Sequence, residues 1–301
     1  MYALAQWISR RPLWLLHVLG AAIGWLAYAL SPTYRARFKG NVRQAGVSEA
    51  AARPAVAEAG RLLLEMPYLW LRPAARPITP EPTLIGTELV EAAYAQGRGI
   101  VFLTPHIGCF EITAQAIAQR FAAAHGPITV LYRPARKAAL RDLMDNTRAR
   151  PGLATAPATL AGVRQLIRAL RRDEAVGLLP DQVPPDGMGV WAPFFGKPAY
   201  TMTLAARLVQ QTGAVPLLVW GERLPAGRGF NVHFLPFDEA LPTDAQAQVE
   251  SATIINRAME RLIRQRPGQY LWGYHRYKQP RAGAELGAQT GAQPGARPGT
   301  E

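Results

Sequence analysis

The sequence predicts an α/β fold, in which helices flank a central mixed sheet and an N-terminal helix anchors the chain in a membrane. Two observations support the prediction. Short apolar runs alternate with Ala-rich stretches of helical spacing, which is typical of an α/β sheet, and a long uncharged apolar segment lies near the N-terminus. Of the 301 residues, 49% are hydrophobic and 18% are charged. This composition allows a sizeable core and excludes a wholly disordered chain or a coiled coil.

The N-terminal segment has the features of a membrane anchor. No residue from Pro12 to Tyr34 carries a formal charge, and the run from Leu13 to Leu30 is 18 residues long. That length is the lower limit for a helix that crosses a bilayer. Aromatic residues near its ends and basic residues on both flanks are typical of a membrane interface, and the larger basic cluster on the C-terminal side favours a cytoplasmic body. We assign residues 1–34 to this anchor, embedded in the membrane or lying on it. A buried core helix and a signal peptide are the alternatives.

Residues 35–280 form the predicted main domain, which follows the anchor. Apolar runs predict strands, and the stretches between them predict helices. Residues 48–71 are expected to be helical, with interruptions at Pro54 and Pro67. Residues 281–301 are rich in Gly, Ala, Pro and Gln without apolar periodicity, which predicts a disordered tail. The expected strands are 99–104, 128–132, 175–179, 214–220 and 230–235, and the expected helices are 87–96, 110–124, 138–148, 158–171, 200–211 and 245–266.

The net charge points to an anionic partner. Lys and Arg total 34 against 21 Asp and Glu, a formal charge of +13. The positive electrostatic field of such a chain would attract nucleic acid, an anionic lipid, a phosphorylated substrate or an acidic carrier protein. A nucleic-acid binder would need a reading helix or an aromatic platform, whereas the basic residues here are spread along the chain, so we expect no nucleic acid. A single cysteine and five histidines exclude a disulfide framework and leave little material for a metal centre, so no metal is expected.

Polar residues follow three predicted strands directly. His106 follows the first strand, Arg133 the second and Asp181 the third. In an open α/β sheet, functional groups gather beyond the carboxyl ends of the strands. Glu111 lies five residues after His106, so the two can meet only if His106 stands in the loop and Glu111 in the first turn of the next helix. A carboxylate beside the imidazole would fix the tautomer of the ring and stabilise its cation. Such a pair can deprotonate a hydroxyl. A helix cap with a glutamate near the helix N-terminus is the alternative.

Sequence motifs that include these residues resemble those of a known protein family. The chain resembles the lipid A biosynthesis late acyltransferases of Gram-negative bacteria, which belong to the glycerolipid-acyltransferase-like proteins, over roughly residues 1–280. The similarity rests on five motifs in order: His106-x4-Glu111 after a strand, Tyr132-Arg133-Pro134, Pro180-Asp181-Gln182, Pro193-Phe194-Phe195-Gly196, and a closing segment from Gln269 to Lys278. Each motif is weak alone, whereas the ordered combination is specific.

The resemblance implies transfer of a fatty acyl chain from acyl carrier protein to a hydroxyl of a lipid A precursor, a phosphorylated glycolipid, at the bacterial inner membrane. No acyl-enzyme is needed, because the donor thioester is already activated, and direct attack is expected. No cofactor is expected. In this interpretation His106 is the general base and Glu111 orients it. Cys109 is interpreted as a small apolar filler instead of a nucleophile.

The resemblance also implies substrate contacts for the remaining motif residues. Arg133 is the first candidate for the oxyanion donor and could instead grip an acceptor phosphate. Asp181 would hold Arg133 or the acceptor, and Arg276 and Lys278 would bind phosphate near the membrane surface. Other acyltransferase functions remain open, with acyl-CoA as donor or with a phosphatidylinositol mannoside, a glycerophosphate or an aminoacyl lipid as acceptor. A non-catalytic membrane scaffold is a distant alternative.

Overall fold

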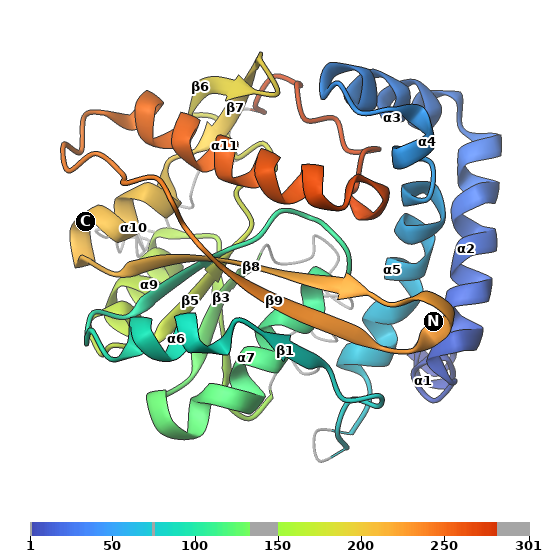
Figure 1. The fold of residues 1–301 in the computed structure, drawn as a ribbon, viewed down its shortest axis with the longest axis horizontal. Helices are drawn as coiled ribbons and strands as arrows, with labels where there is room; N and C mark the ends of the chain where they lie inside the picture. The colour runs from blue at the N-terminus through green and yellow to red at the C-terminus, as the bar shows by residue number, and fades with distance from the viewer. Residues whose placement is uncertain (1, 74–75, 133–149, 282–301) are drawn as a thin grey trace, which may run out of the picture.

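The core of the molecule is a mixed seven-stranded sheet with helices on both faces (Figure 1). The computed structural model describes residues 2–73, 76–132 and 150–281. The strand order is β1-β9-β8-β2-β5-β3-β4. Strand β2 lies centrally and runs parallel to both of its neighbours, while β8 and β9 pair antiparallel. The predicted α/β class with a mixed sheet is therefore confirmed. The strands are β1 (Thr83–Ile85), β2 (Ile100–Leu103), β3 (Ile128–Tyr132), β4 (Leu153–Pro157), β5 (Ala175–Leu178), β8 (Val215–Arg223) and β9 (Phe230–Pro236).

All five expected strands are present within a few residues of their predicted bounds, but others escaped sequence reasoning. Strand β1 has three residues, and β4 reads LATAP, so neither forms a run of bulky apolar residues. The hairpin of β6 (Gly189–Phe194) and β7 (Lys197–Met202) lies outside the main sheet. Because residues 200–202 belong to β7, the helix expected from residue 200 begins only at Leu204.

Two helical layers bury the two faces of the sheet. In β2, Ile100 and Phe102 enter one core, and Val101 and Leu103 enter the other, as the alternation of side chains along a strand requires. The first core lies under α6 (Thr87–Tyr94) and α7 (Phe110–His125). The second lies under α9 (Leu160–Leu170), α10 (Leu204–Thr212) and α11 (Gln248–Gln265). The helix expected at residues 138–148 lies outside the described residues.

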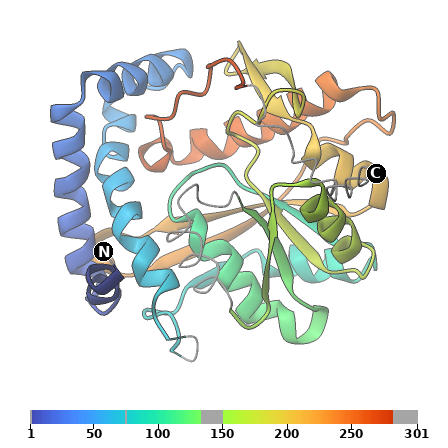
Figure 2. The ribbon, with the colours of Figure 1, turned by 180° about the vertical axis from the view of Figure 1, so that it is seen from behind.

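The N-terminal helices gather at one end of the molecule, beside the ends of β8 and β9 (Figures 1 and 2). The sequence prediction of a break at Pro54 is confirmed, whereas the break at Pro67 is wrong, because α5 continues through this proline. Helix α2 coincides with the predicted anchor. The elements are α1 (Tyr2–Ser9), α2 (Leu13–Leu30), α3 (Pro32–Gln44), α4 (Glu49–Ala52) and α5 (Ala55–Trp70).

Helix α2 packs closely against α5 on one face and exposes apolar side chains on the other. A Cβ on Gly24 would lie 2.2 Å from the carbonyl oxygen of Val56, and a Cβ on Gly60 would lie 2.0 Å from that of Gly20. These glycines therefore let the two backbones approach. On the opposite face, Val18 is 61% exposed. Helix α2 is long and apolar enough to cross a membrane. It also packs against α5 and is thereby part of the folded protein.

Candidate active site

His106 and Asp181 meet at the carboxyl ends of neighbouring strands. Strands β2 and β5 pair in parallel, with Leu103 opposite Leu178, so the loops that follow them begin side by side. His106 Nδ1 lies 2.6 Å from Asp181 Oδ1, and the backbone N–H of His106 donates to Asp181 Oδ2 at 3.0 Å. Both oxygens of one carboxylate therefore hold the ring and the backbone of the same histidine.

The hydrogen bond between Asp181 and Nδ1 makes the two ring nitrogens of His106 different. Ionised Asp181 can only accept, so the proton lies on Nδ1 and leaves a lone pair on Nε2. No described residue hydrogen-bonds to Nε2. Burial opposes ionisation of Asp181, but the positive charge of His106 in its protonated form and the hydrogen bonds from His106 outweigh it and hold the pKa of this carboxyl below its ordinary value. The histidine side chain is 16% exposed and the aspartate 2%. The pair is therefore shielded from solvent and leaves one ring nitrogen open.

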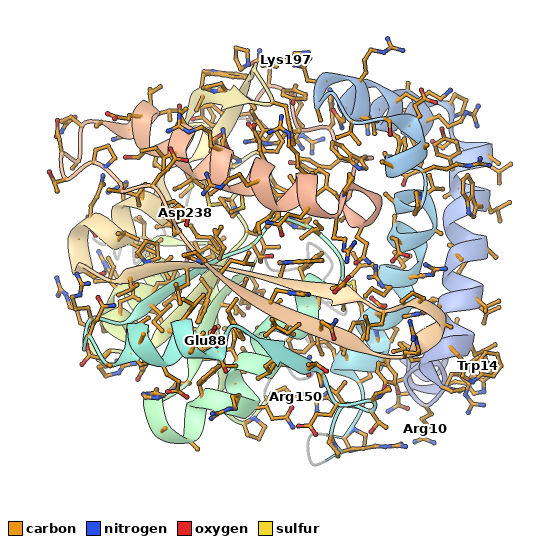
Figure 3. All side chains as sticks on the ribbon, in the orientation of Figure 1. Arg10, Trp14, Glu88, Arg150, Lys197 and Asp238 are labelled. Atoms are coloured by element: carbon orange, nitrogen blue, oxygen red, sulfur yellow. The ribbon has the colours of Figure 1, made fainter. Side chains whose placement is uncertain are left out.

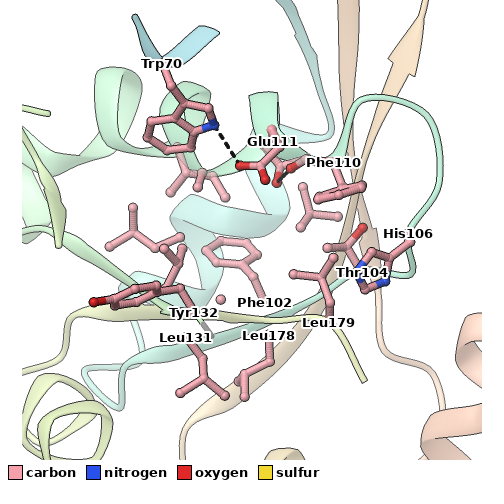
Figure 4. Close-up of a pocket in the computed structure, with 17 residues that line it drawn as sticks. Trp70, Phe102, Thr104, His106, Phe110, Glu111, Leu131, Tyr132, Leu178 and Leu179 are labelled. Carbon is pink, nitrogen blue, oxygen red and sulfur yellow. Dashed lines mark hydrogen bonds between the residues drawn. The ribbon is translucent and has the colours of Figure 1, made fainter. Parts of the chain in front are cut away.

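Glu111 does not occupy the position that we expected beside the imidazole. It lies in the first turn of α7, as predicted, but its carboxylate accepts a hydrogen bond from Trp70 Nε1 at 3.0 Å (Figure 4). The ring nitrogen Nδ1 is taken by Asp181 instead. The correction has a topological reason, because only the strand order places β5 beside β2 and brings residue 181 to residue 106. Asp181 was recognised as a strand-end residue, but sequence alone does not tell which strands are neighbours.

His106 and Glu111 line one apolar pocket of about 210 Å³. His106 lies at one side of it and Tyr132 at the other, with Phe102 between them (Figure 4). Most other lining side chains are hydrocarbon, so the pocket suits an alkyl chain with its reactive end beside the histidine. They include Ala114, Ile117, Ile128, Val130, Leu131, Leu178, Leu179 and Val219.

Backbone hydrogen bonds pin the loop that carries His106. The N–H of Gly108 donates to Gln269 O at 2.9 Å, the N–H of Cys109 donates to Gly221 O at 2.8 Å, and the N–H of Leu271 donates to His106 O at 3.1 Å. Gly108 has φ +57°, and a Cβ there would lie 2.0 Å from the oxygen of Gly221. The loop thus needs glycine at this position, and the closing sequence motif, through Gln269 and Leu271, helps to hold it.

A buried ionic cluster that sequence reasoning missed also holds this loop. Arg223 Nη2 donates to Gly108 O at 3.1 Å and to Glu65 Oε2 at 2.6 Å, and Glu58 is a further partner of this guanidinium. Glu65 also contacts His17 Nε2 at 2.7 Å, which ties α2 into the cluster. Burial opposes ionisation of Glu65, but Arg223 and His17 lower its pKa to about 2. The charged residues come from distant segments, so no local spacing could have indicated the cluster.

Three other residues, Arg276, Lys278 and Arg133, were expected to contact the substrate. Arg276 is 2% exposed, and its guanidinium donates to Tyr200 O and Thr201 Oγ1, so its position is structural and does not suit the expected phosphate contact. Lys278 is half-buried, with Nζ 4.9 Å from the ring centroid of Tyr274. Arg133 lies outside the described residues.

Cys109 has the properties of a packing residue. Cys109 is fully buried and does not line the pocket, and burial raises the pKa of its thiol. Such a thiol is a packing group and a poor nucleophile. Among residues 2–73, 76–132 and 150–281, no three His, Cys, Asp or Glu side chains lie together in a way that could hold a metal ion.

The chain is similar to several known proteins. Residues 4–279 match the family model described as bacterial lipid A biosynthesis acyltransferase. The chain is 26% identical over 222 residues to the lipid A biosynthesis palmitoleoyltransferase of Escherichia coli (strain K12), covering 73% of this chain and 68% of the relative. It is 27% identical over 220 residues to the lipid A biosynthesis lauroyltransferase of the same organism, covering 73% and 69%. A lipid A biosynthesis acyltransferase of Shigella flexneri is 26% identical over 222 residues, covering 73% and 68%.

Proposed function

The chain belongs to the bacterial lipid A biosynthesis acyltransferase family and is an O-acyltransferase, and from this premise we propose its donor, acceptor and catalytic residues. The donor is a fatty acyl thioester of acyl carrier protein, and the acceptor is a hydroxyl of a phosphorylated lipid A precursor. The observation that carries the proposal is the His106–Asp181 pair, with its open nitrogen at the side of an apolar pocket. An alkyl chain in that pocket would place its thioester beside the base.

In the proposed reaction, Nε2 of His106 removes the proton from the acceptor hydroxyl as the oxygen attacks the thioester carbonyl. Asp181 keeps the other ring proton on Nδ1 and stabilises the imidazolium that forms. The tetrahedral intermediate then collapses with cleavage of the carbon–sulfur bond. The imidazolium returns the proton to the departing thiolate, so the histidine ends as it began. This step needs no covalent acyl-enzyme.

The remaining sequence-predicted residues keep roles outside the proton transfer. Glu111 shares the pocket with His106 and anchors Trp70, so we assign it to shaping the pocket wall. Arg133 follows Tyr132 in the chain and remains the proposed donor to the oxyanion or to an acceptor phosphate. Lys278 remains a proposed phosphate contact.

We also propose that the protein works at the bacterial inner membrane with its catalytic body on the cytoplasmic side. The exposed apolar face of α2 supports contact with a bilayer, since Trp14 and Leu30 are 56% and 73% exposed. The basic residues that follow α2, Arg35, Arg37 and Lys39, support the cytoplasmic orientation.

The test is acyl transfer by the purified full-length protein in detergent. Radiolabelled lipid A precursor is offered with acyl carrier protein that carries chains of several lengths, and acyl-CoA is offered in parallel. We expect labelled product from the acyl carrier protein, lost by at least 100-fold in His106→Ala. Asp186→Asn is the matched control, because Asp186 is exposed on the same loop as Asp181. Product from acyl-CoA alone would overturn the donor, and transfer only to another lipid hydroxyl would overturn the acceptor.

A further inference from the structure

Arginines line two adjoining cavities at the end of the molecule where α1 meets α2. One cavity, of about 380 Å³, lies between this corner and the end of α5, and the other, of about 500 Å³, lies between the end of α5 and α7. Both include Arg72 and Arg76, so we treat them as one arginine cleft. No Asp or Glu is among the described residues that line it. The arginines of the cleft are Arg10, Arg11, Arg72, Arg76 and Arg150.

Two of these arginines support the fold and still have unused donor capacity. Arg150 Nη2 donates to Trp70 O at 2.6 Å and to Arg72 O at 2.7 Å, beyond the C-terminal end of α5. Its Nε is buried and has no hydrogen-bond partner. Arg72 Nη1 donates to Gln115 Oε1 at 2.7 Å. Burial, and after it the charge of Arg150, lowers the pKa of Arg72 to about 10. The two cations therefore repel each other, and no Asp or Glu of the described residues neutralises either of them.

Arg10 and Arg76 are the accessible donors of the cleft. Both are exposed, and no described residue hydrogen-bonds or ion-pairs with either guanidinium. Arginine is well suited to phosphate, because its planar fork can donate two parallel hydrogen bonds to one phosphoryl group. The cleft thus offers half-buried positive charge behind exposed donors that have no partner among the described residues, and such an arrangement can bind an anion.

Exposed apolar residues beside the cleft indicate the rest of the ligand. Trp14 lines the smaller cavity and is 56% exposed, Trp7 is 50% exposed and Leu4 is 62% exposed. Figure 3 shows Arg10 and Trp14 together at one corner, with Arg150 along the same edge of the molecule. Tryptophan favours the membrane–water interface, where one end of its ring is apolar and the other is wet. A phosphate site that borders such residues fits a lipid better than a free ion.

We propose that the arginine cleft binds the phosphate of an anionic lipid headgroup, while the acyl chains of that lipid lie over Trp14 and the exposed face of α2. The cleft shares no lining residue with the pocket of His106. It is therefore a second lipid site, which does not depend on the proposed acyl transfer. A headgroup held there would fix the depth at which the N-terminal helices sit in the bilayer surface.

The test is isothermal titration of the full-length protein in a non-ionic detergent, with detergent blanks, against short-chain lipids. Dihexanoylphosphatidic acid is expected to bind with one-to-one stoichiometry. Dihexanoylphosphatidylcholine, which has no net charge, and inorganic phosphate, which has no acyl chains, are each expected to bind at least tenfold more weakly. Equal binding of the phosphatidylcholine would overturn the proposal. Inorganic phosphate that binds as tightly as phosphatidic acid would overturn the lipid assignment and make the cleft a free-phosphate site.

Variants link the binding to the cleft. Arg10→Gln with Arg76→Gln is expected to weaken phosphatidic acid binding at least tenfold. Arg98→Gln with Arg207→Gln removes two exposed charges elsewhere and is expected to change binding less than twofold. Trp14→Ser is expected to weaken phosphatidic acid binding and to leave phosphate binding unchanged, because it removes only the apolar contact. Equal effects of the two arginine pairs would overturn the proposal, since they would show attraction by net charge alone.

Discussion

Replacing Asp181 with asparagine tests the catalytic base most directly. The carboxylate holds Nδ1 of His106 with one oxygen and the backbone N–H of the same residue with the other. An amide has only one oxygen, so one of the two bonds fails in either orientation of its side chain. If the nitrogen faces the ring, the proton is driven to Nε2, which can then no longer act as the base. The substitution changes neither the volume nor the burial of the side chain.

The size of the effect follows from the charge on the pair. Two unit charges at about 4 Å and an effective dielectric constant of about 20 interact by about 4 kcal/mol, which corresponds to a loss of about 10³-fold in kcat. We expect KM to change little, because Asp181 is 2% exposed and is shielded from a ligand in the pocket.

The assay is steady-state transfer with the wild type, Asp181→Asn and the exposed control Asp186→Asn. The double variant His106→Ala/Asp181→Asn should be no slower than His106→Ala alone, because Asp181 acts through the histidine. A loss below tenfold in Asp181→Asn, or an equal loss in the control, would refute this assignment. Additive losses in the double variant would show that Asp181 acts independently of the ring.

Three further predictions concern the pocket, the buried charges and the helix contact. Ala114→Leu, which fills part of the 210 Å³ pocket, should shift the preferred acyl chain to a shorter length in competition assays with mixed acyl donors. Glu65→Gln leaves Arg223 with less counter-charge and should lower the free energy of unfolding by roughly 3 kcal/mol in urea titrations near pH 7. Because the folded pKa of Glu65 is about 2 against an ordinary 4.5, its stabilisation of the wild type is complete above pH 4.5 and is lost as the pH falls toward 2. A contribution that stays constant or grows as the pH falls through that window would contradict the ion pair. Gly60→Ala should lower the midpoint of thermal unfolding, because its Cβ would meet the backbone of α2, whereas Gly40→Ala, whose Cβ meets nothing within 4 Å, should leave the midpoint unchanged or raise it.

Local sequence patterns were sufficient for much of the fold. The bounds of β3 agree residue for residue with the sequence prediction, and α2 has the bounds of the apolar run within the predicted anchor. Both patterns are properties of consecutive residues. Where the pattern was weak, prediction failed. Strand β4 has small residues and a proline, and α5 continues through Pro67 because tertiary packing outweighs the local break.

The sequence by itself determined the α/β class, the apolar anchor helix, the family resemblance and the placement of His106 in a loop before Glu111. Only the tertiary structure decided which carboxylate serves the histidine. Residues 106 and 181 are far apart in the chain and meet because β5 pairs with β2. The same holds for Arg276, for which the resemblance implied a phosphate contact and which instead donates, buried, to Tyr200 O and Thr201 Oγ1. Spacing along a chain reports which side chains share one element, whereas contacts between elements depend on strand order and on helix packing, which no local pattern encodes.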